Sequence, residues 1–484
     1  MSKSKSGAGY IWSLLERFMS QGVTLVVSII LARLLDPSHY GVVAIVTIFT
    51  TLGITFVTAG FGAALVQMQN PEDEDYNTAF TLNLTISIVL YGVFFFAAPA
   101  IAAFYETPEL VNVLRIMSLL LPISAFSTIK YAYLQKQLQF KKYAIVTLSA
   151  SLLSGVIGIV MALTGFGVYA LVAQSVSKYL IDMIVLYIVC PLKSRIGFSM
   201  ERCKKMFPFA SKVFLSTLVM NIESDIRGLV IGKKYTSSDL AYYNKAATFP
   251  KMIVMNTNGA VSRVLFPTIA NSQDDLPKVL AFVRKNVVMQ SFLITPLVVG
   301  LMAVAKPFIL TLLGDNWAPA IPFMYLICLT YLMMPYENTC KEAILGIGRS
   351  DIVFMDMIIT KSVSLATIIV AVVFTNSVHL IAVGGIVATA VSLVLYSTQM
   401  KKFFNYSIKD QLQDLGGAYT CCAIMGVSTF CLNFLNLPPF VTLVIQVAFG
   451  VAVYCVLAKL FRLKAFEDTL KMIRKRGKKN AENQ

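Results

Sequence analysis

Several charged side chains fall inside long apolar stretches of this sequence, where a charge is costly. A charge at the centre of a bilayer costs about 3 kcal/mol or more, so such residues usually face a water-filled cavity or a charged partner. Lys251 has no acidic residue within one helical turn, which makes it the best candidate to contact an anionic substrate. The charges at such positions are Arg17, Lys178, Asp182, Glu223, Asp225, Arg227, Lys251, Asp356 and Lys361.

Two of these charge pairs leave two interpretations open. Lys178 with Asp182, and Glu223 with Arg227, are spaced i,i+4, so each pair either lines a cavity or neutralises itself between packed helices. If transport is coupled to protons or sodium ions, Asp182, Glu223 or Asp225 would carry the ion. The residues do not indicate which ion this would be.

Rows of polar side chains recur at spacings of three and four residues in four of the apolar stretches, which places each row on one helix face. Lipid offers no hydrogen-bond partner to these groups. They predict a hydrated cavity between the first, second, seventh and eighth helices, whereas close packing through hydroxyl side chains remains the alternative. The candidate cavity residues are Arg17, Gln21, Thr24, Thr51, Thr55, Asn221, Lys251 and Asn258.

The elements that would carry these residues are apolar helices. The chain has 484 residues, 57% hydrophobic and 14% charged, where soluble proteins have about 25% charged residues. Nearly the whole sequence divides into stretches long enough to span a bilayer, which requires about 20 apolar residues. We therefore predict an all-α polytopic membrane protein of about fourteen transmembrane helices. Their expected ranges are 10–35, 38–66, 77–104, 110–134, 143–163, 167–190, 207–232, 239–266, 286–306, 318–344, 352–375, 380–400, 415–434 and 440–461.

The net charge of +16 is distributed as membrane topology requires rather than as a nucleic-acid surface. Lysine and arginine concentrate in alternate loops and in the C-terminal tail, and only Lys233, Lys234 and Lys306 fall in the opposite turns. The positive-inside rule then places both termini in the cytoplasm. The basic tail at 471–479 would bind anionic membrane lipids or a partner, unless it is only a topology determinant.

Nothing in the sequence indicates catalysis, a resident cofactor or a metal site. The eight cysteines form no CxxC pair, and His39 and His379 fall in different turns. The turns predicted on the far side of the membrane are short, so binding is expected within the membrane. The first helix lacks a cleavage site and is expected to be retained.

An internal repeat about 200 residues long divides the chain. The end of the first helix and the start of the second (31–41) are echoed at 231–241. Parallel repeats of this kind are a transporter architecture. We predict two six-helix lobes, at 1–205 and 206–404, followed by two C-terminal helices and a basic tail at 405–484.

Motifs along most of the chain resemble bacterial polysaccharide-unit flippases of the Wzx type. The first group is residues 31–37 (LARLLDP), Tyr40-Gly41 and residues 60–67 (GFGAALVQ). The second group is residues 229–233 (LVIGK), 242–245 (YYNK), Phe249-Pro250, 264–267 (VLFP), 314–317 (GDNW) and 348–351 (GRSD). They resemble the branch of the multidrug/oligosaccharidyl-lipid/polysaccharide (MOP) superfamily that exports lipopolysaccharide, colanic acid and teichuronic acid. Ala241 departs from the glycine that would mirror Gly41.

The resemblance implies transfer of an undecaprenyl-pyrophosphate-linked oligosaccharide across the bacterial inner membrane by alternating access. The implied partners are that lipid-linked oligosaccharide, a polysaccharide polymerase and glycosyltransferases, with no nucleic acid. Alternatives of the same fold are a multidrug transporter and a peptidoglycan-precursor flippase. A membrane polysaccharide polymerase or ligase would need a large external loop, which is not predicted, and a structural subunit of a synthesis complex would transport nothing by itself.

Overall fold

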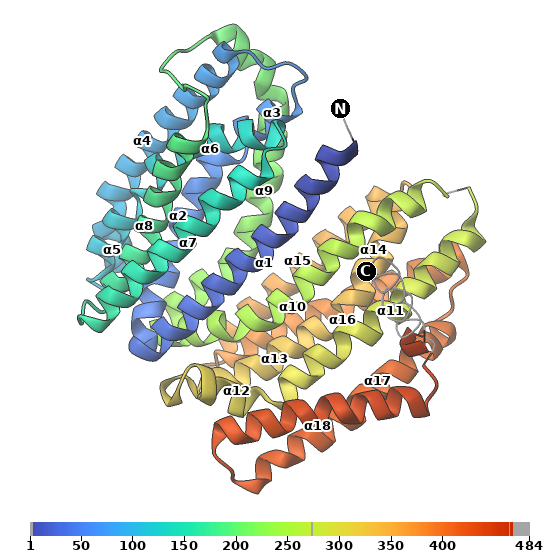
Figure 1. The fold of residues 1–484 in the computed structure, drawn as a ribbon. Coiled ribbons are helices and arrows are strands. Elements are labelled where there is room, and N and C mark those ends of the chain that lie inside the picture. The colour runs from blue at the N-terminus through green and yellow to red at the C-terminus, as the bar shows by residue number, and fades with distance from the viewer. Residues whose placement is uncertain (1–2, 273, 464, 468–484) are drawn as a thin grey trace, which may run out of the picture. The chain divides into compact units, whose positions relative to one another are not determined.

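The computed structural model describes residues 3–272, 274–463 and 465–467, and within these ranges the chain is helical with no strand. By contacts it divides into two compact units, Met1–Ala241 and Tyr242–Gln484. The helices of the first unit are α1 (Lys3–Leu34), α2 (Pro37–Thr58), α3 (Phe61–Gln67), α4 (Asp73–Phe104), α5 (Leu110–Met117), α6 (Leu120–Lys136), α7 (Phe140–Leu163), α8 (Val168–Val189) and α9 (Met200–Lys234). Figure 1 shows α1 running along α7, against which it packs.

The second unit begins within α10 and contains the remaining helices. These are α10 (Ser237–Ala270), α11 (Leu276–Ala303), α12 (Ala305–Leu312), α13 (Ala320–Leu332), α14 (Met334–Gly346), α15 (Ser350–Phe374), α16 (His379–Phe404), α17 (Ile408–Cys431) and α18 (Pro439–Leu460). Two 3-10 turns, η1 (Asp315–Trp317) and η2 (Leu432–Leu435), complete the described chain.

Eleven helical segments of the described residues are long and apolar enough to cross a membrane. They include α2 with α3, α5 with α6, and α13 with α14, each pair counted as one segment. The long helices α1, α9 and α10 fall outside this set, although α1 contains the shorter apolar stretch Met19–Leu34. All three carry polar rows predicted from the sequence, and each includes residues whose side chains lie outside the described part of the chain. The prediction of an all-α polytopic membrane protein is confirmed.

The repeat seen in the sequence reappears as two helix breaks 200 residues apart. α1 ends at Leu34 and α2 begins at Pro37, while α9 ends at Lys234 and α10 begins at Ser237. Pro37 suits the first turn of α2, where its missing N–H is not needed. At α10, Thr236 and Asp239 accept hydrogen bonds from each other's backbone N–H, as in a capping box. Each break is thus produced by local sequence.

The compact units divide the chain at a different place from the predicted repeats. α9 packs against α2, α3 and α4, so by contacts it belongs with the first unit. The predicted boundary at 205/206 follows from a similarity between two parts of the sequence, whereas the compact units are defined by which helices pack together. The lobes at 1–205 and 206–404 and the terminal segment at 405–484 therefore stay a prediction.

The C-terminal helices are attached to the second unit by packing and by one ion pair. α17 packs on α11, and α18 lies beside α17 (Figure 1). The Arg284 guanidinium on α11 donates two hydrogen bonds, of 2.7 and 2.8 Å, to the Asp414 carboxylate on α17. The Tyr406 hydroxyl donates to the same carboxylate at 2.7 Å. A bidentate arginine–carboxylate pair provides orientation as well as energy.

Replacing Asp414 with asparagine is expected to destabilise the protein by about 1.5–3 kcal/mol, because an amide cannot accept both arginine donors and hydrogen bonds to charged groups contribute this much. The measurement is thermal unfolding of the detergent-purified protein. The matched control is Asp351→Asn, because Asp351 pairs with Arg349 at 2.7 Å on the surface, where pairs contribute little. Equal losses in the two variants would contradict a special role for the Arg284–Asp414 pair.

Candidate functional site

A cavity of about 610 Å³ lies within the first unit, surrounded by α1, α2, α3, α6, α7 and α8. Its volume falls within the range of about 300–1,000 Å³ that small-molecule sites occupy. Thirteen of its eighteen lining residues carry a polar side-chain group, although apolar atoms make up more of the wall's surface. The polar lining residues are Ser20, Thr58, Ser124, Ser127, Thr128, Tyr131, Gln135, Tyr143, Thr147, Ser151, Lys178, Tyr179 and Asp182.

The charged part of the wall is Lys178 and Asp182, one turn apart on α8. The Tyr131 hydroxyl on α6 donates a 2.5 Å hydrogen bond to the Asp182 carboxylate. Among the described residues, Lys178 and Asp182 do not form a close ion pair. The Lys178 side chain is exposed, as expected of a lysine that extends its ammonium toward water. The structure thus places both predicted residues at one cavity and adds Tyr131, which the sequence analysis missed.

Most serine and threonine hydroxyls of the wall donate to carbonyl groups of their own helix. Ser124 donates to the Leu121 carbonyl at 2.7 Å, Thr128 to the Ser124 carbonyl at 2.7 Å, and Thr58 to the Ile54 carbonyl at 2.9 Å. Such bonds are how hydroxyl side chains satisfy themselves inside apolar helices. A hydroxyl that has donated its proton still has acceptor capacity. This part of the wall therefore presents acceptors.

The polar rows of α2 and α9 meet inside the first unit. The Asn221 amide on α9 donates a 2.7 Å hydrogen bond to the Thr55 hydroxyl on α2, and Thr55 donates to the Thr51 carbonyl at 2.8 Å. Three predicted residues are thus brought together, although they are not among the residues around the 610 Å³ cavity. Gln21 and Thr24 on α1 are half-buried and exposed respectively, and they also lie outside that cavity wall.

The predicted residues of the second unit are dispersed along its helices. Lys251 on α10 and Lys361 on α15 are exposed, whereas Asn258 on α10 is buried with 4% of its surface exposed. Asp356 is buried and accepts a 3.1 Å hydrogen bond from Ser392 on α16. Asp356 and Lys361 lie close enough for their charges to interact. This does not place Lys251 or Asn258 at a cavity, so their role there stays a prediction.

Four predicted charges lie on helices whose side chains are only partly described. Asp225 and Arg227 on α9 are half-buried. The side chains of Arg17 and Glu223 lie outside the described residues. The predicted Glu223–Arg227 pair and the cavity role of Arg17 therefore stay predictions.

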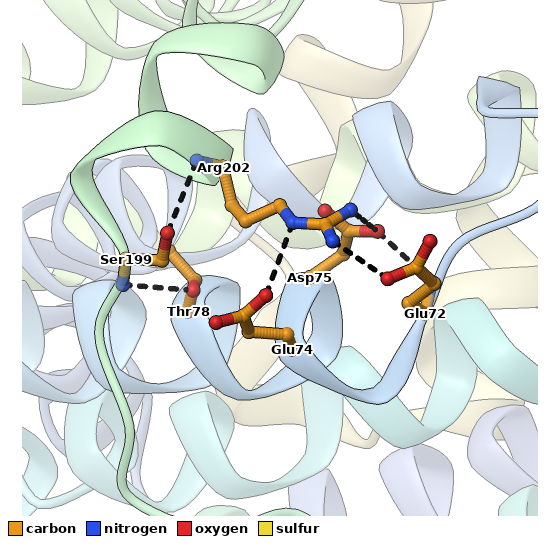
Figure 2. Close-up of polar contacts among 6 residues, drawn as sticks. All are labelled: Glu72, Glu74, Asp75, Thr78, Ser199 and Arg202. Carbon is orange, nitrogen blue, oxygen red and sulfur yellow. Dashed lines mark hydrogen bonds and ion pairs between the residues drawn. The ribbon is translucent and has the colours of Figure 1, made fainter.

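An ion-pair cluster fixes the start of α9 to the start of α4, and its arginine is not among the site residues predicted from the sequence. Figure 2 shows the Arg202 guanidinium among three carboxylates, with contacts of 2.6 Å to Glu72, 3.2 Å to Glu74 and 3.5 Å to Asp75. Asp75 has no exposed side-chain surface. The hydrogen bond that Arg202 donates to Glu72 and the charges of all three acids raise the pKa of Arg202, which keeps it charged. The signal available in the sequence was the acidic run at 72–75.

The same end of the first unit is reinforced by hydrogen bonds from the α8–α9 connection. The backbone N–H of Ser199 donates to the Thr78 hydroxyl at 3.2 Å (Figure 2), and Thr81 exchanges hydrogen bonds with the Gly197 backbone at 2.9 and 3.0 Å. The Ser199 side chain in turn caps α9. These contacts position α9, the helix that carries Asn221.

Comparisons with known proteins agree with the motif resemblance. Residues 30–322 match the family described as "Polysaccharide biosynthesis protein". The chain is 30% identical to the succinoglycan biosynthesis transport protein ExoT of Rhizobium meliloti (strain 1021), over 71% of this chain and 69% of ExoT. It is 24% identical to the teichuronic acid biosynthesis protein TuaB of Bacillus subtilis (strain 168), over 87% of each chain. It is also 23% identical to the lipopolysaccharide biosynthesis protein WzxC of Escherichia coli (strain K12), over 73% of this chain and 72% of WzxC.

The fold is that of solved transporters of the MOP superfamily. It is similar to a structure of the lipid II flippase MurJ in an inward closed conformation, with a TM-score of 0.74, 17% identity, and coverage of 95% of this chain and 100% of that one. An inward-facing multidrug MATE transporter gives a TM-score of 0.60 at 15% identity, over 82% of this chain and 99% of that one. At these identities the likeness concerns the fold alone. A family match over more than half of the sequence and a similar relative at 30% identity together show that this multi-pass membrane chain belongs to the polysaccharide biosynthesis protein family.

Proposed function

We propose that this protein is a flippase that moves undecaprenyl-pyrophosphate-linked oligosaccharide units across the bacterial inner membrane for surface-polysaccharide synthesis. The observation that carries the proposal is a cavity of about 610 Å³ among apolar helices, lined by thirteen residues with polar side chains, in a member of this family. Lipid cannot hydrogen-bond such a wall, so the wall is suited to water or a polar head group. Similar relatives are named for transport or biosynthesis of succinoglycan, teichuronic acid and lipopolysaccharide, which supports transport rather than catalysis.

The proposed route keeps the polyprenyl chain in lipid while the sugar head crosses through polar surroundings. Alternating access by rearrangement of helix bundles would expose the head first to the cytoplasm and then to the other side. Both termini are proposed to lie in the cytoplasm because of the lysine and arginine distribution. Glycosyltransferases would supply the substrate and a polymerase would consume the product. The basic tail would contact anionic lipids.

Coupling to a proton or sodium gradient is part of the proposal. Asp182 is the carboxylate at the cavity wall, which supports it as the ion carrier in the first unit. Transport into vesicles with an imposed pH gradient, an imposed sodium gradient or neither would separate the two ions.

The direct test is reconstitution of the purified protein into liposomes that contain lipid-linked oligosaccharide extracted from cells carrying it. Flipping is measured as the fraction of sugar that becomes accessible to membrane-impermeant periodate at the outer leaflet. Faster exposure than in protein-free liposomes supports the proposal, and equal rates contradict it. A fluorescent cationic drug in place of the glycolipid tests multidrug transport, which the fold shared with the MATE transporter makes the second candidate.

Replacing Lys251 with glutamate is expected to reduce flipping at least about tenfold at normal membrane levels, because an acid would repel the pyrophosphate that the lysine is proposed to attract. The control is Lys278→Glu, which makes the same charge reversal at an exposed position in the first turn of α11. Normal flipping by the Lys251 variant would remove this lysine from the proposed route.

A further inference from the structure

The cavity of the first unit has a wall whose hydrogen-bonding character can be specified. Ser124, Thr128 and Thr58 have each donated their proton to a carbonyl of their own helix. Their oxygens retain acceptor capacity toward the cavity that they line. The Asp182 carboxylate is a further acceptor in the same wall. The same wall includes donor groups in Lys178, Gln135 and Tyr179, so a complementary ligand offers both hydrogen-bond donors and acceptors, as sugar hydroxyls do.

The charge of the wall argues against an anionic group at this position. Its lining contains one lysine and one aspartate, so its net formal charge is zero. A pyrophosphate carries several negative charges, and the single lysine of the wall is already offset by the Asp182 carboxylate. Burying a charged group without a counter-charge is costly. The wall therefore suits an uncharged ligand better than a phosphate.

Aromatic faces supply the apolar part of the lining. The rings of Tyr131 on α6 and Tyr143 on α7 lie 4.8 Å apart between centroids, with their planes inclined at 50°. Both tyrosines line the cavity. A sugar ring combines hydroxyl donors at its edge with C–H faces that pack against aromatic rings, so this wall offers a partner to each part.

We infer that this cavity is a recognition site for an uncharged sugar residue of the transported unit, separate from wherever the pyrophosphate is held. The inference rests on the proposed function and deepens it, because it assigns the sugar part of the substrate to α2, α6, α7 and α8 of the first unit. Ser124, Thr128 and Asp182 accept hydrogen bonds from sugar hydroxyls, and Tyr131 and Tyr143 contact the ring.

The test removes acceptors without changing side-chain volume much. The double variant Ser124→Ala/Thr128→Val is compared with Thr85→Val on α4. Thr85 is exposed, does not line the cavity, and donates a 2.8 Å hydrogen bond to the Thr81 carbonyl of its own helix. Flipping of the cellular lipid-linked oligosaccharide is measured over a range of substrate concentrations. The cavity variant is expected to raise KM about tenfold, and the control variant is expected to match the unaltered protein. An unchanged KM in the cavity variant would overturn the inference.

Binding of separated parts of the substrate identifies what the cavity holds. Mild acid releases the free oligosaccharide from the glycolipid and leaves the sugar without phosphate. The released oligosaccharide is expected to bind the purified protein, with affinity reduced about tenfold by the double variant, while binding of polyprenyl pyrophosphate is unchanged. Loss of pyrophosphate binding in the double variant, or equal oligosaccharide binding by all proteins, would contradict the assignment.

A second variant checks that a loss of binding is not caused by misfolding. The outcomes below also distinguish failure of the sugar site from failure of the proposed function. Ala63→Leu adds volume to the cavity wall from α3 and leaves every hydroxyl in place. It is expected to abolish oligosaccharide binding while thermal unfolding shows a folded protein, and normal binding would contradict the inference. If the unaltered protein flips no glycolipid, the proposed function fails. If the unaltered protein flips glycolipid and every cavity variant flips it with an unchanged KM, the proposed function stands and only the assignment of the sugar site is contradicted.

Discussion

Replacing Gly41 with valine is expected to prevent stable folding of the first unit. Gly41 is buried near the start of α2, where a Cβ atom would lie 1.9 Å from the Ser237 carbonyl oxygen and 2.2 Å from its carbonyl carbon. Both atoms belong to the backbone at the start of α10 and cannot rotate away as a side chain can. Overpacking typically costs about 1–3 kcal/mol even where side chains can adjust. The expected loss here is at the upper end of that range or beyond it.

The measurement is thermal unfolding followed by a thiol-reactive dye, because Cys190, Cys328, Cys340, Cys421 and Cys422 are buried in the folded protein. The matched control is Gly92→Ala in α4, where an added Cβ would meet nothing within 4 Å. Alanine is the better helix former by about 1 kcal/mol, so this control is expected to be as stable as the unaltered protein or slightly more stable. Equal unfolding temperatures for the Gly41 and Gly92 variants would show that Gly41 and Ser237, both in the first unit, do not approach closely.

Replacing Arg202 with glutamine is expected to cause the second large loss, because it leaves the buried Asp75 carboxylate without a counter-charge (Figure 2). Breaking a buried ion pair by removing one partner costs about 3–5 kcal/mol, most of it from the uncompensated buried charge. Glu72 and Glu74 are largely exposed and can be solvated instead. The start of α9 would lose its attachment to α4, so both the unfolding temperature and flipping are expected to fall.

The decisive comparison is a double-mutant cycle with Asp75→Asn. Removing the buried charge in the Arg202→Gln background is expected to recover part of the lost stability, because an amide oxygen can still accept the 2.9 Å hydrogen bond from the Glu72 backbone. Arg349→Gln serves as the control, since its partner Asp351 is 61% exposed and can be solvated by water. No recovery in the cycle, or equal losses for the two arginine variants, would contradict the role given to Asp75.

The sequence alone predicted the helical class, most helix ends and the two breaks 200 residues apart. Each depends on neighbouring residues: an apolar run long enough for a bilayer, Pro37 at a helix start, or Thr236 and Asp239 at a cap. Helix periodicity also placed Lys178 and Asp182 on one face of α8. Periodicity could not predict that the Asp182 carboxylate accepts a hydrogen bond from the Tyr131 hydroxyl, 51 residues earlier in the chain.

The site depended on contacts that no local pattern encodes. Asn221 meets Thr55 across 166 residues, and Arg202 reaches the acidic run at 72–75 across about 130. The sequence therefore determined which residues are helical, which turns carry positive charge and which helices are polar, because length, hydropathy and capping act within a few residues. Only the tertiary structure decided which polar faces meet and where the cavity lies. A buried hydroxyl, amide or carboxylate takes the partner that helix packing brings within hydrogen-bonding distance, however far apart the two are in the chain.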